Sequence, residues 1–151
     1  MRTTTRRAMA AAALVPLLTG LTACSDSKDK DADAVGGNPG QQACGPLPSA
    51  NPAAKLPTGF PAGDEEFLYE PSTQGKTQIV WGLIHDTDFV NIRDDYVSKM
   101  KAAGWHLDGT DQESVEAEAQ FSKSSPALVT GSIKVAPLCK GYVTIRYKGS
   151  F

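Results

Sequence analysis

The chain has 151 residues, of which 40% are hydrophobic and 21% are charged, and its formal net charge at pH 7 is −2. This length allows one modest domain, and the acidic balance argues against nucleic acid or anionic lipid headgroups as partners, because both require basic patches. No cofactor-binding motif is recognised, so no cofactor is expected.

The first 23 residues have the pattern of an export signal. Three arginines, at positions 2, 6 and 7, precede an uncharged apolar stretch over residues 8–18. That stretch is too short for a membrane-spanning helix, which takes about 20 apolar residues, whereas this arrangement is typical of a secretory signal peptide. Removal of residues 1–23 takes away three of the 15 basic residues and no acidic one. The remaining chain then has 12 basic and 17 acidic residues, a formal charge of −5.

The apolar stretch is followed by Leu21-Thr22-Ala23-Cys24. This tetrapeptide resembles the lipobox of bacterial lipoproteins. The resemblance implies cleavage between Ala23 and Cys24, a diacylglyceryl thioether on Cys24, and palmitate-like acyl chains that anchor the protein on the extracytoplasmic face of the cell membrane. One acyl chain, at about 0.8 kcal/mol per buried methylene, holds a protein only marginally, so two or three chains on one residue make a stable anchor. The alternative is an ordinary signal peptide followed by a cysteine that joins a disulfide.

The export route is left open by the leader. The Arg6-Arg7 pair is similar to a twin-arginine signal, but the Phe that usually follows such a pair is missing. Two arginines also suit the basic start of a general secretory signal.

Three cysteines are an odd number for an exported protein. If Cys24 is acylated, Cys44 and Cys139 remain as a pair in an oxidising compartment, where disulfides persist. Two free thiols, or a redox or metal site, are the alternatives. The chain has no C-x-x-C motif and only two histidines, His85 and His106. A structural Cys44–Cys139 disulfide is therefore favoured.

Residues 24–55 contain Cys24 and a tract rich in Asp, Gly, Pro, Ala, Ser and Gln without apolar periodicity. Such composition is typical of a flexible tether. About 20 flexible residues, from Cys24 to Cys44, average about 25 Å from end to end. We therefore expect a tether that lifts the domain off the membrane, with Cys44 holding its far end, and a globular domain over residues 56–151.

The domain is expected to begin with two strands and a helix. Residues 67–69 form a short strand that ends at Glu70-Pro71 and a Ser-Thr-Gln-Gly turn, and residues 77–84 form a second strand rich in β-branched and aromatic residues. A helix is expected over about residues 90–103, with carboxylates near its positive end and a glycine after its last turn. Its expected features are Asp94 and Asp95 near the start, a buried stripe of Val90, Val97 and Met100, and Gly104 as the C-cap.

Four further strands are expected after the helix. Residues 105–107 form a short strand broken by Asp108-Gly109, and residues 115–121 alternate strictly between apolar and polar, as a strand with one wet face does. Residues 132–135 and 143–148 repeat the alternation and are joined as a hairpin through residues 137–141. The order β-β-α-β-β-β-β predicts an α+β domain with one helix packed on a mostly antiparallel sheet.

Four segments of this domain, LPTGFP, AAGW, DQESVEAEAQF and VAPLCKGYVTIRYK, are similar to the small lipoproteins common in actinobacteria. The resemblance supports the architecture and implies no activity.

Glu116 and Glu118 are the first candidates for chemistry. Two residues apart on a strand, they share one face at roughly 6–7 Å, near the separation of a glycosidase carboxylate pair. However, Lys134, Arg146 and Lys148 lie on the polar faces of the following strands. Cross-strand charge pairs explain the same residues without catalysis, and this interpretation is favoured.

His85, Asp86 and Asp88 end a strand and are the second candidates. A calcium loop would need an acid or amide where Val90 stands and a glycine where Asn91 stands, and zinc would need more His or Cys ligands. An Asp-rich turn before the helix is favoured, no metal is expected, and His106 is expected to face water.

The favoured function is a non-catalytic, membrane-anchored extracytoplasmic lipoprotein that binds or modulates an envelope protein. One alternative is a small cell-envelope hydrolase that uses Glu116, Glu118 or the turn at His85. The other is an inhibitor-like module in which a sheet face or the Cys139 hairpin blocks a partner enzyme. An exposed aromatic cluster on the sheet would favour the inhibitor.

Overall fold

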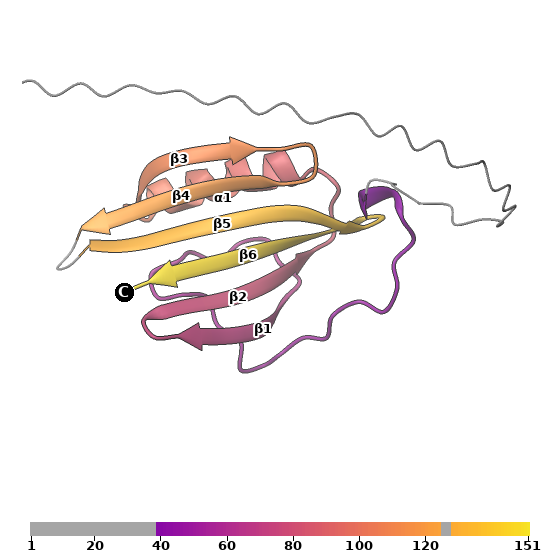
Figure 1. Cartoon of the computed structure of the whole chain (residues 1–151), viewed down its shortest axis with the longest axis horizontal. Coiled ribbons are helices and arrows are strands. Elements are labelled where there is room, and N and C mark those ends of the chain that lie inside the picture. Colours follow the sequence, from indigo (N-terminus) through magenta and orange to yellow (C-terminus); the bar gives the residue numbers. More distant parts are fainter. Residues whose placement is uncertain (1–38, 125–127) are drawn as a thin grey trace, which may run out of the picture. The chain divides into compact units, whose positions relative to one another are not determined.

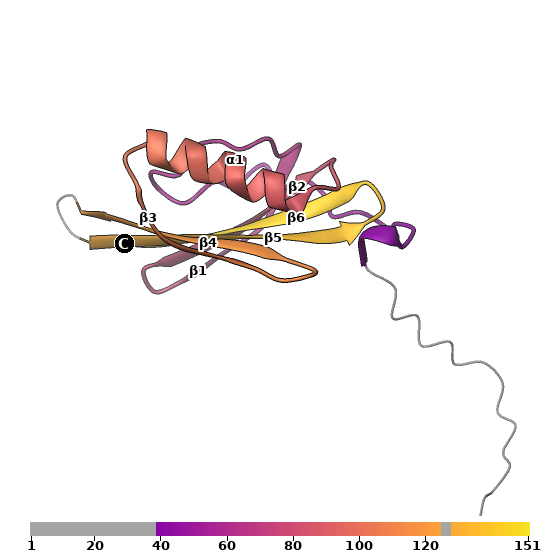
Figure 2. The same cartoon turned by 90° about the horizontal axis from the view of Figure 1, so that it is seen from above.

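The computed structural model describes residues 39–124 and 128–151 (Figure 1). These residues form one six-stranded antiparallel sheet, with one α-helix packed on one of its faces (Figures 1 and 2). The elements in chain order are the 3₁₀ turn η1 (Pro39–Gln41), β1 (Phe67–Gln74), β2 (Thr77–Ile84), α1 (Phe89–Ala102), β3 (His106–Gln112), β4 (Ala117–Ser124), β5 (Leu128–Cys139) and β6 (Tyr142–Ser150). The predicted α+β class and the order β-β-α-β-β-β-β are confirmed. The predicted leader, Cys24 and the first part of the predicted tether lie outside the described residues.

The strand order in the sheet is β1-β2-β6-β5-β4-β3. After the β1–β2 hairpin, α1 carries the chain across one face to the far edge, where β3 begins (Figure 1). The chain then returns through β4 and β5, and β6 pairs with β2 from Thr77↔Ser150 to Ile84↔Val143. The last strand thus lies in the middle of the sheet, between β2 and β5.

β1 runs further than the sequence predicted. Glu70-Pro71 was expected to end the strand, but pairing with β2 resumes at Ser72 and continues to Gln74 after a register shift. Glu70 has a φ of 46°. An edge strand tolerates a proline at a bulge, because the missing N–H breaks no ladder hydrogen bond there. The turn consists of Gly75 and the next residue, and the predicted Ser-Thr-Gln-Gly turn is wrong.

Other strand boundaries also differ from the predictions. β3 does not break at Asp108-Gly109, because a bulge between Leu107 and Gly109 absorbs the extra residue. β4 begins at Ala117, and Val115 lies outside it with 40% of its surface exposed. The β5–β6 turn is shorter than predicted, since both strands extend to within two residues of each other.

The predicted helix is confirmed at Phe89–Ala102, but its N-terminal cap is different. Asp88 caps the helix, and its carboxylate accepts a hydrogen bond from the backbone N–H of Asn91 at 3.0 Å. The two carboxylates predicted near the start, on Asp94 and Asp95, lie beyond the first turn and are exposed. Ala103, not the predicted Gly104, is the C-cap, and Gly104 follows it with a φ of 81°, the left-handed conformation that commonly ends a helix.

The predicted buried stripe of α1 is confirmed in part. Val97 and Met100 are buried, whereas Val90 is half-buried. Arg93 and Tyr96 are buried in addition. Arg93 is accommodated because its guanidinium pairs with the next residue and donates to the carbonyl of Asp111 at 3.2 Å, so the buried charge keeps its partners.

The main core lies between the sheet and α1, and a second segment covers the rest of that face. Residues 54–66 pack beside the helix, and the Phe60 ring meets the Trp105 ring edge-on, with 5.3 Å between centroids. The indole of Trp105 donates to the carbonyl of Gly59 at 3.0 Å. These contacts attach the segment to Trp105, which follows it in the chain only after β1, β2 and α1.

Two paired glycines, Gly131 on β5 and Gly149 on β6, make room for this segment. A Cβ on Gly131 would lie 2.6 Å from Cζ of Phe60, and one on Gly149 would lie 2.7 Å from Cβ of Pro57. Any larger side chain would therefore displace the covering segment.

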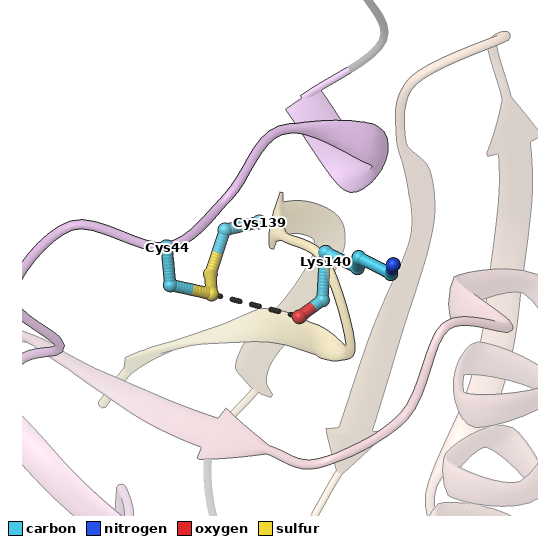
Figure 3. The surroundings of a disulfide bond; sticks show 3 residues. All are labelled: Cys44, Cys139 and Lys140. Atoms are coloured by element: carbon cyan, nitrogen blue, oxygen red, sulfur yellow. Dashed lines mark hydrogen bonds between the residues drawn. A yellow bond between two sulfur atoms is a disulfide. The ribbon is translucent and has the colours of Figure 1, made fainter.

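The predicted Cys44–Cys139 disulfide is confirmed, with 5.1 Å between the two Cα atoms (Figure 3). Sγ of Cys44 lies 3.6 Å from the carbonyl oxygen of Lys140, whose own N–H donates to the carbonyl of Gln42 at 2.7 Å. The bridge joins residues 95 apart, and the chain-entropy estimate for such a loop is about 4–5 kcal/mol, an upper value.

The chain between the disulfide and residue 56 is also held at the sheet edge. The N–H of Asn51 donates to the carbonyl of Leu68 on β1 at 2.9 Å. The later part of the segment predicted as tether is therefore attached to the domain at the β5–β6 hairpin and at β1.

Candidate functional site: the open face of the sheet

The sheet face opposite α1, called the open face here, carries the candidate site. Figure 2 shows α1 on the other face. Along β6, Val143, Ile145 and Tyr147 are fully buried against the core, and Arg146 and Lys148 alternate with them on the open face. Cross-strand partners share a face, so the pairing registers identify the open-face residues of every strand.

The open-face side chains form three bands that run along the strands. The aromatic band consists of Tyr69 on β1 and Trp81 on β2. The cationic band consists of Arg146 and Lys148 on β6 and Lys134 on β5. The acidic band consists of Glu118 on β4 and Asp111 on β3. The registers that place the bands side by side are Tyr69↔Trp81, Trp81↔Arg146, Arg146↔Lys134, Lys134↔Glu118 and Glu118↔Asp111.

Lys134 joins the cationic and acidic bands. Its Nζ lies 2.6 Å from Glu116 and 3.1 Å from Glu118. Hydrogen bonds to Glu116 and then to Glu118 raise the pKa of the Lys134 ammonium above its usual value. The predicted cross-strand charge pairs are confirmed for this lysine, and its ammonium occupies the space between the two carboxylates.

Arg146 and Lys148 differ from Lys134. Among the described residues, neither forms an ion pair with a carboxylate, although charge pairs were predicted for both. The guanidinium of Arg146 lies over the Trp81 ring, 5.8 Å from its centroid. Its Nε is buried and has no hydrogen-bond partner in the described part of the chain. A buried donor without a partner is uncommon in a folded protein.

A depression of about 410 Å³ lies over β4, β5 and β6 on this face and reaches Asp108 on β3. Its polar side chains combine two cations, hydroxyls and an amide with two carboxylates. They belong to Arg146, Lys148, Thr130, Ser132, Ser150, Gln120, Glu118 and Asp108.

The turn at His85, Asp86 and Asp88 is the Asp-rich turn that the sequence favoured. The carboxylate of Asp86 accepts the backbone N–H groups of Asp88, at 2.9 Å, and of Thr87, and these hydrogen bonds lower the pKa of Asp86. Asp88 is used as the helix cap. Within residues 39–124 and 128–151, no group of three or more His, Cys, Asp or Glu side chains is arranged to hold a metal. His106 faces water as predicted, with 78% of its side chain exposed.

The structure separates the aromatic residues, which the sequence could not do. Trp105 and Tyr147 are core residues on the helix face, while Trp81 and Tyr142 are half-buried. Tyr69 is buried although it lies on the open face, beside residues 48–52, with which it lines a shallow pocket. The exposed aromatic cluster that would favour an inhibitor is therefore not formed by these five residues.

No protein-family model matches the chain, and comparison with curated proteins and with solved structures finds no match. In the described part of the chain, α1 is too short and too polar to cross a membrane.

Proposed function

We propose that the protein is a lipoprotein, anchored through Cys24 on the extracytoplasmic face of the cell membrane, whose domain is a non-catalytic binding module. The observation that carries the binding role is the open face, on which aromatic, cationic and acidic bands lie side by side without a covering helix. The anchor rests on the sequence of residues 21–24.

The disulfide supports the proposed location. Because Cys44 and Cys139 are bonded to each other, Cys24 is the cysteine left over from the three in the chain. Disulfides persist in oxidising compartments outside the cytoplasm. A third cysteine directly after a leader is then explained by acylation.

The two alternatives have less support. A hydrolase that used Glu116 and Glu118 would need room for a glycosidic bond between the carboxylates, and Lys134 Nζ lies there. An inhibitor that used the Cys139 hairpin would present the exposed Leu138 beside the disulfide, a single apolar side chain.

The anchor is tested by intact mass spectrometry of the protein extracted from its own membranes. The expected mass is that of residues 24–151 plus acyl chains, rising by about 2 Da on reduction as one disulfide takes up two hydrogens. Cys24→Ser should release the protein from the membrane fraction, and Cys44→Ser, which leaves Cys24 intact, should not. An unacylated wild-type chain would contradict the anchor.

The binding role is tested by native mass spectrometry of the same extract. A bound component should be lost from Lys148→Glu, on the open face, and kept by Lys101→Glu, an equal charge change on an exposed position of α1. Equal retention by both variants, or no bound component on the wild type, would contradict a binding role for the open face.

A further inference from the structure

The depression on the open face has an electrostatic character of its own within an acidic protein. Arg146 and Lys148 line it on neighbouring open-face positions of β6. An arginine side chain carries five N–H donors and stays charged at any physiological pH. In the described part of the chain, no carboxylate forms an ion pair with either cation, and Arg146 keeps a buried, unpartnered Nε.

Each of the two carboxylates that line the depression has a partner. Glu118 pairs with Nζ of Lys134 at 3.1 Å. Asp108 accepts a hydrogen bond from the hydroxyl of Ser122 at 2.8 Å. The two carboxylates balance the formal charge of the two cations over the depression as a whole, but the cations lie side by side on β6 and have no ion-pair partner in the described part of the chain. The negatively charged part of a ligand therefore fits at Arg146 and Lys148.

The neutral lining groups indicate what carries that negative charge. Thr130, Ser132 and Gln120 offer hydroxyl and amide groups, which both donate and accept hydrogen bonds and so match the hydroxyls of a sugar. The hydroxyl of Ser150 already shares a hydrogen bond with that of Thr77 at 2.8 Å. Trp81 does not line the depression; its ring lies under the Arg146 guanidinium, 5.8 Å from the ring centroid, and so positions that cation.

The position in the sheet disfavours an extended peptide. Extended peptides bind to sheets by adding a strand at an edge, whereas all but one of the residues that line the depression lie on β4, β5 and β6, which are paired on both sides. Its volume of about 410 Å³ lies at the lower end of the range for small-molecule sites, roughly 300–1,000 Å³. This size suits one or two sugar units.

We propose that the depression binds an anionic saccharide, with a phosphate or carboxylate group on Arg146 and Lys148 and the sugar hydroxyls on Thr130, Ser132 and Gln120. This proposal rests on the proposed binding role of the open face and specifies its ligand. Since the chain has a formal charge of −5 without its leader, the site selects an anion by local donors against the overall charge.

The test is calorimetric titration of the full mature chain, purified in detergent, with four small probes at low ionic strength. Glucose 6-phosphate and glucuronate carry both features, whereas glucose lacks the charge and inorganic phosphate lacks the ring. We expect either charged sugar to bind at least about tenfold more tightly than glucose and than phosphate, one charge-assisted hydrogen bond being sufficient for such a factor. The preferred charged sugar distinguishes phosphate from carboxylate recognition.

Two variants locate the binding. Lys148→Gln removes an exposed cation without disturbing the core and should weaken charged-sugar binding about tenfold or more. Arg146→Gln should do the same, and its thermal unfolding will show whether the loss of the Trp81 contact affects the fold. Lys101→Gln, with the same change of charge on α1, should bind like the wild type.

Three results would overturn the proposal: no binding of either charged sugar, equal weakening by Lys101→Gln, or binding of a glutamate-rich peptide in preference to both sugars. The last result would keep the open face as a binding surface and replace its ligand class. The titration uses added sugars, whereas the mass-spectrometric tests use the protein extracted from its own membranes. Failure of the titration therefore leaves the tests of the anchor and of open-face binding unaffected.

Discussion

The two faces of the sheet are built from alternate residues of the same strands, and they obey different constraints. On β6, Ile145 is fully buried against the core, while its neighbour Arg146 lies on the open face. On the helix face, the space available in the core limits the size of each side chain, because protein interiors are close-packed. The open face is packed only in part: Leu83 and Tyr69 are buried there, while Lys148 is exposed. At its accessible positions, charge pairing and binding are the remaining reasons for particular side chains.

The difference is clearest where the same residue type occurs in two roles. Lys134 is held by two carboxylates, which explains it as a structural cross-strand partner. Lys148, on the next strand, has no such partner among the described residues. A cation that the fold does not use is the better candidate for recognising a ligand.

The largest expected effect is on packing. Ile145→Ala should lower the free energy of unfolding by about 2–5 kcal/mol, because it leaves a cavity in the helix-face core. Ile79→Ala, on the half-buried open face beside Lys148, should lower it by less than about 1.5 kcal/mol, since less apolar surface is re-exposed. Urea unfolding of both variants measures the two values, and similar losses would contradict the distinction between the faces.

A smaller effect is expected at the glycines. Gly131→Ala places a Cβ against the Phe60 ring and should lower the free energy of unfolding by about 1–3 kcal/mol through overpacking. Gly109→Ala meets no atom within 4 Å and should be neutral or stabilising by up to about 1 kcal/mol. Thermal unfolding of the pair gives the comparison. If Gly131→Ala is harmless, residues 54–66 do not cover the helix face tightly.

The smallest effect is expected at Tyr147, whose hydroxyl donates to Glu65 at 3.1 Å. Tyr147→Phe should lower stability at neutral pH by about 0.5–1.5 kcal/mol, the net value of one hydrogen bond.

The pH dependence of this variant should also change. Burial, with the nearby Glu65 and Tyr96, raises the pKa of Tyr147 above its usual 10.0. The folded state therefore holds this proton more tightly than the unfolded state, so the contribution is complete below about pH 10 and is lost as the pH rises further. Tyr96 and Tyr69 act in the same direction, and burial raises the pKa of Tyr69 to about 12. Unfolding followed from neutral to alkaline pH should show a shallower decline for Tyr147→Phe than for the wild type, and equal slopes would contradict the assignment.

Several features of this protein were determined by the sequence alone, because their signals are local. Alternation over residues 143–148 and a 3.6-residue period over α1 identified a strand and a helix, and hence the α+β class. The count of three cysteines, once Cys24 was set aside, left one pairing for Cys44 and Cys139. The sequence predicts strand ends at Pro71 and Gly109, and both predictions are wrong because a bulge absorbs an irregular residue at a sheet edge.

Only the tertiary structure decided what the open face contains. Trp81, Arg146, Lys134 and Glu118 come from four strands, and they lie in one row because β6 inserts between β2 and β5. The alternation within a strand predicts which face of the sheet a residue lies on, but not which residue of another strand lies beside it. The strand order and the register therefore could not be predicted from any single strand. The covering of Gly131 by Phe60, 71 positions earlier in the chain, likewise depends on long-range packing. A site built from side chains so far apart in sequence becomes visible only once the sheet has assembled.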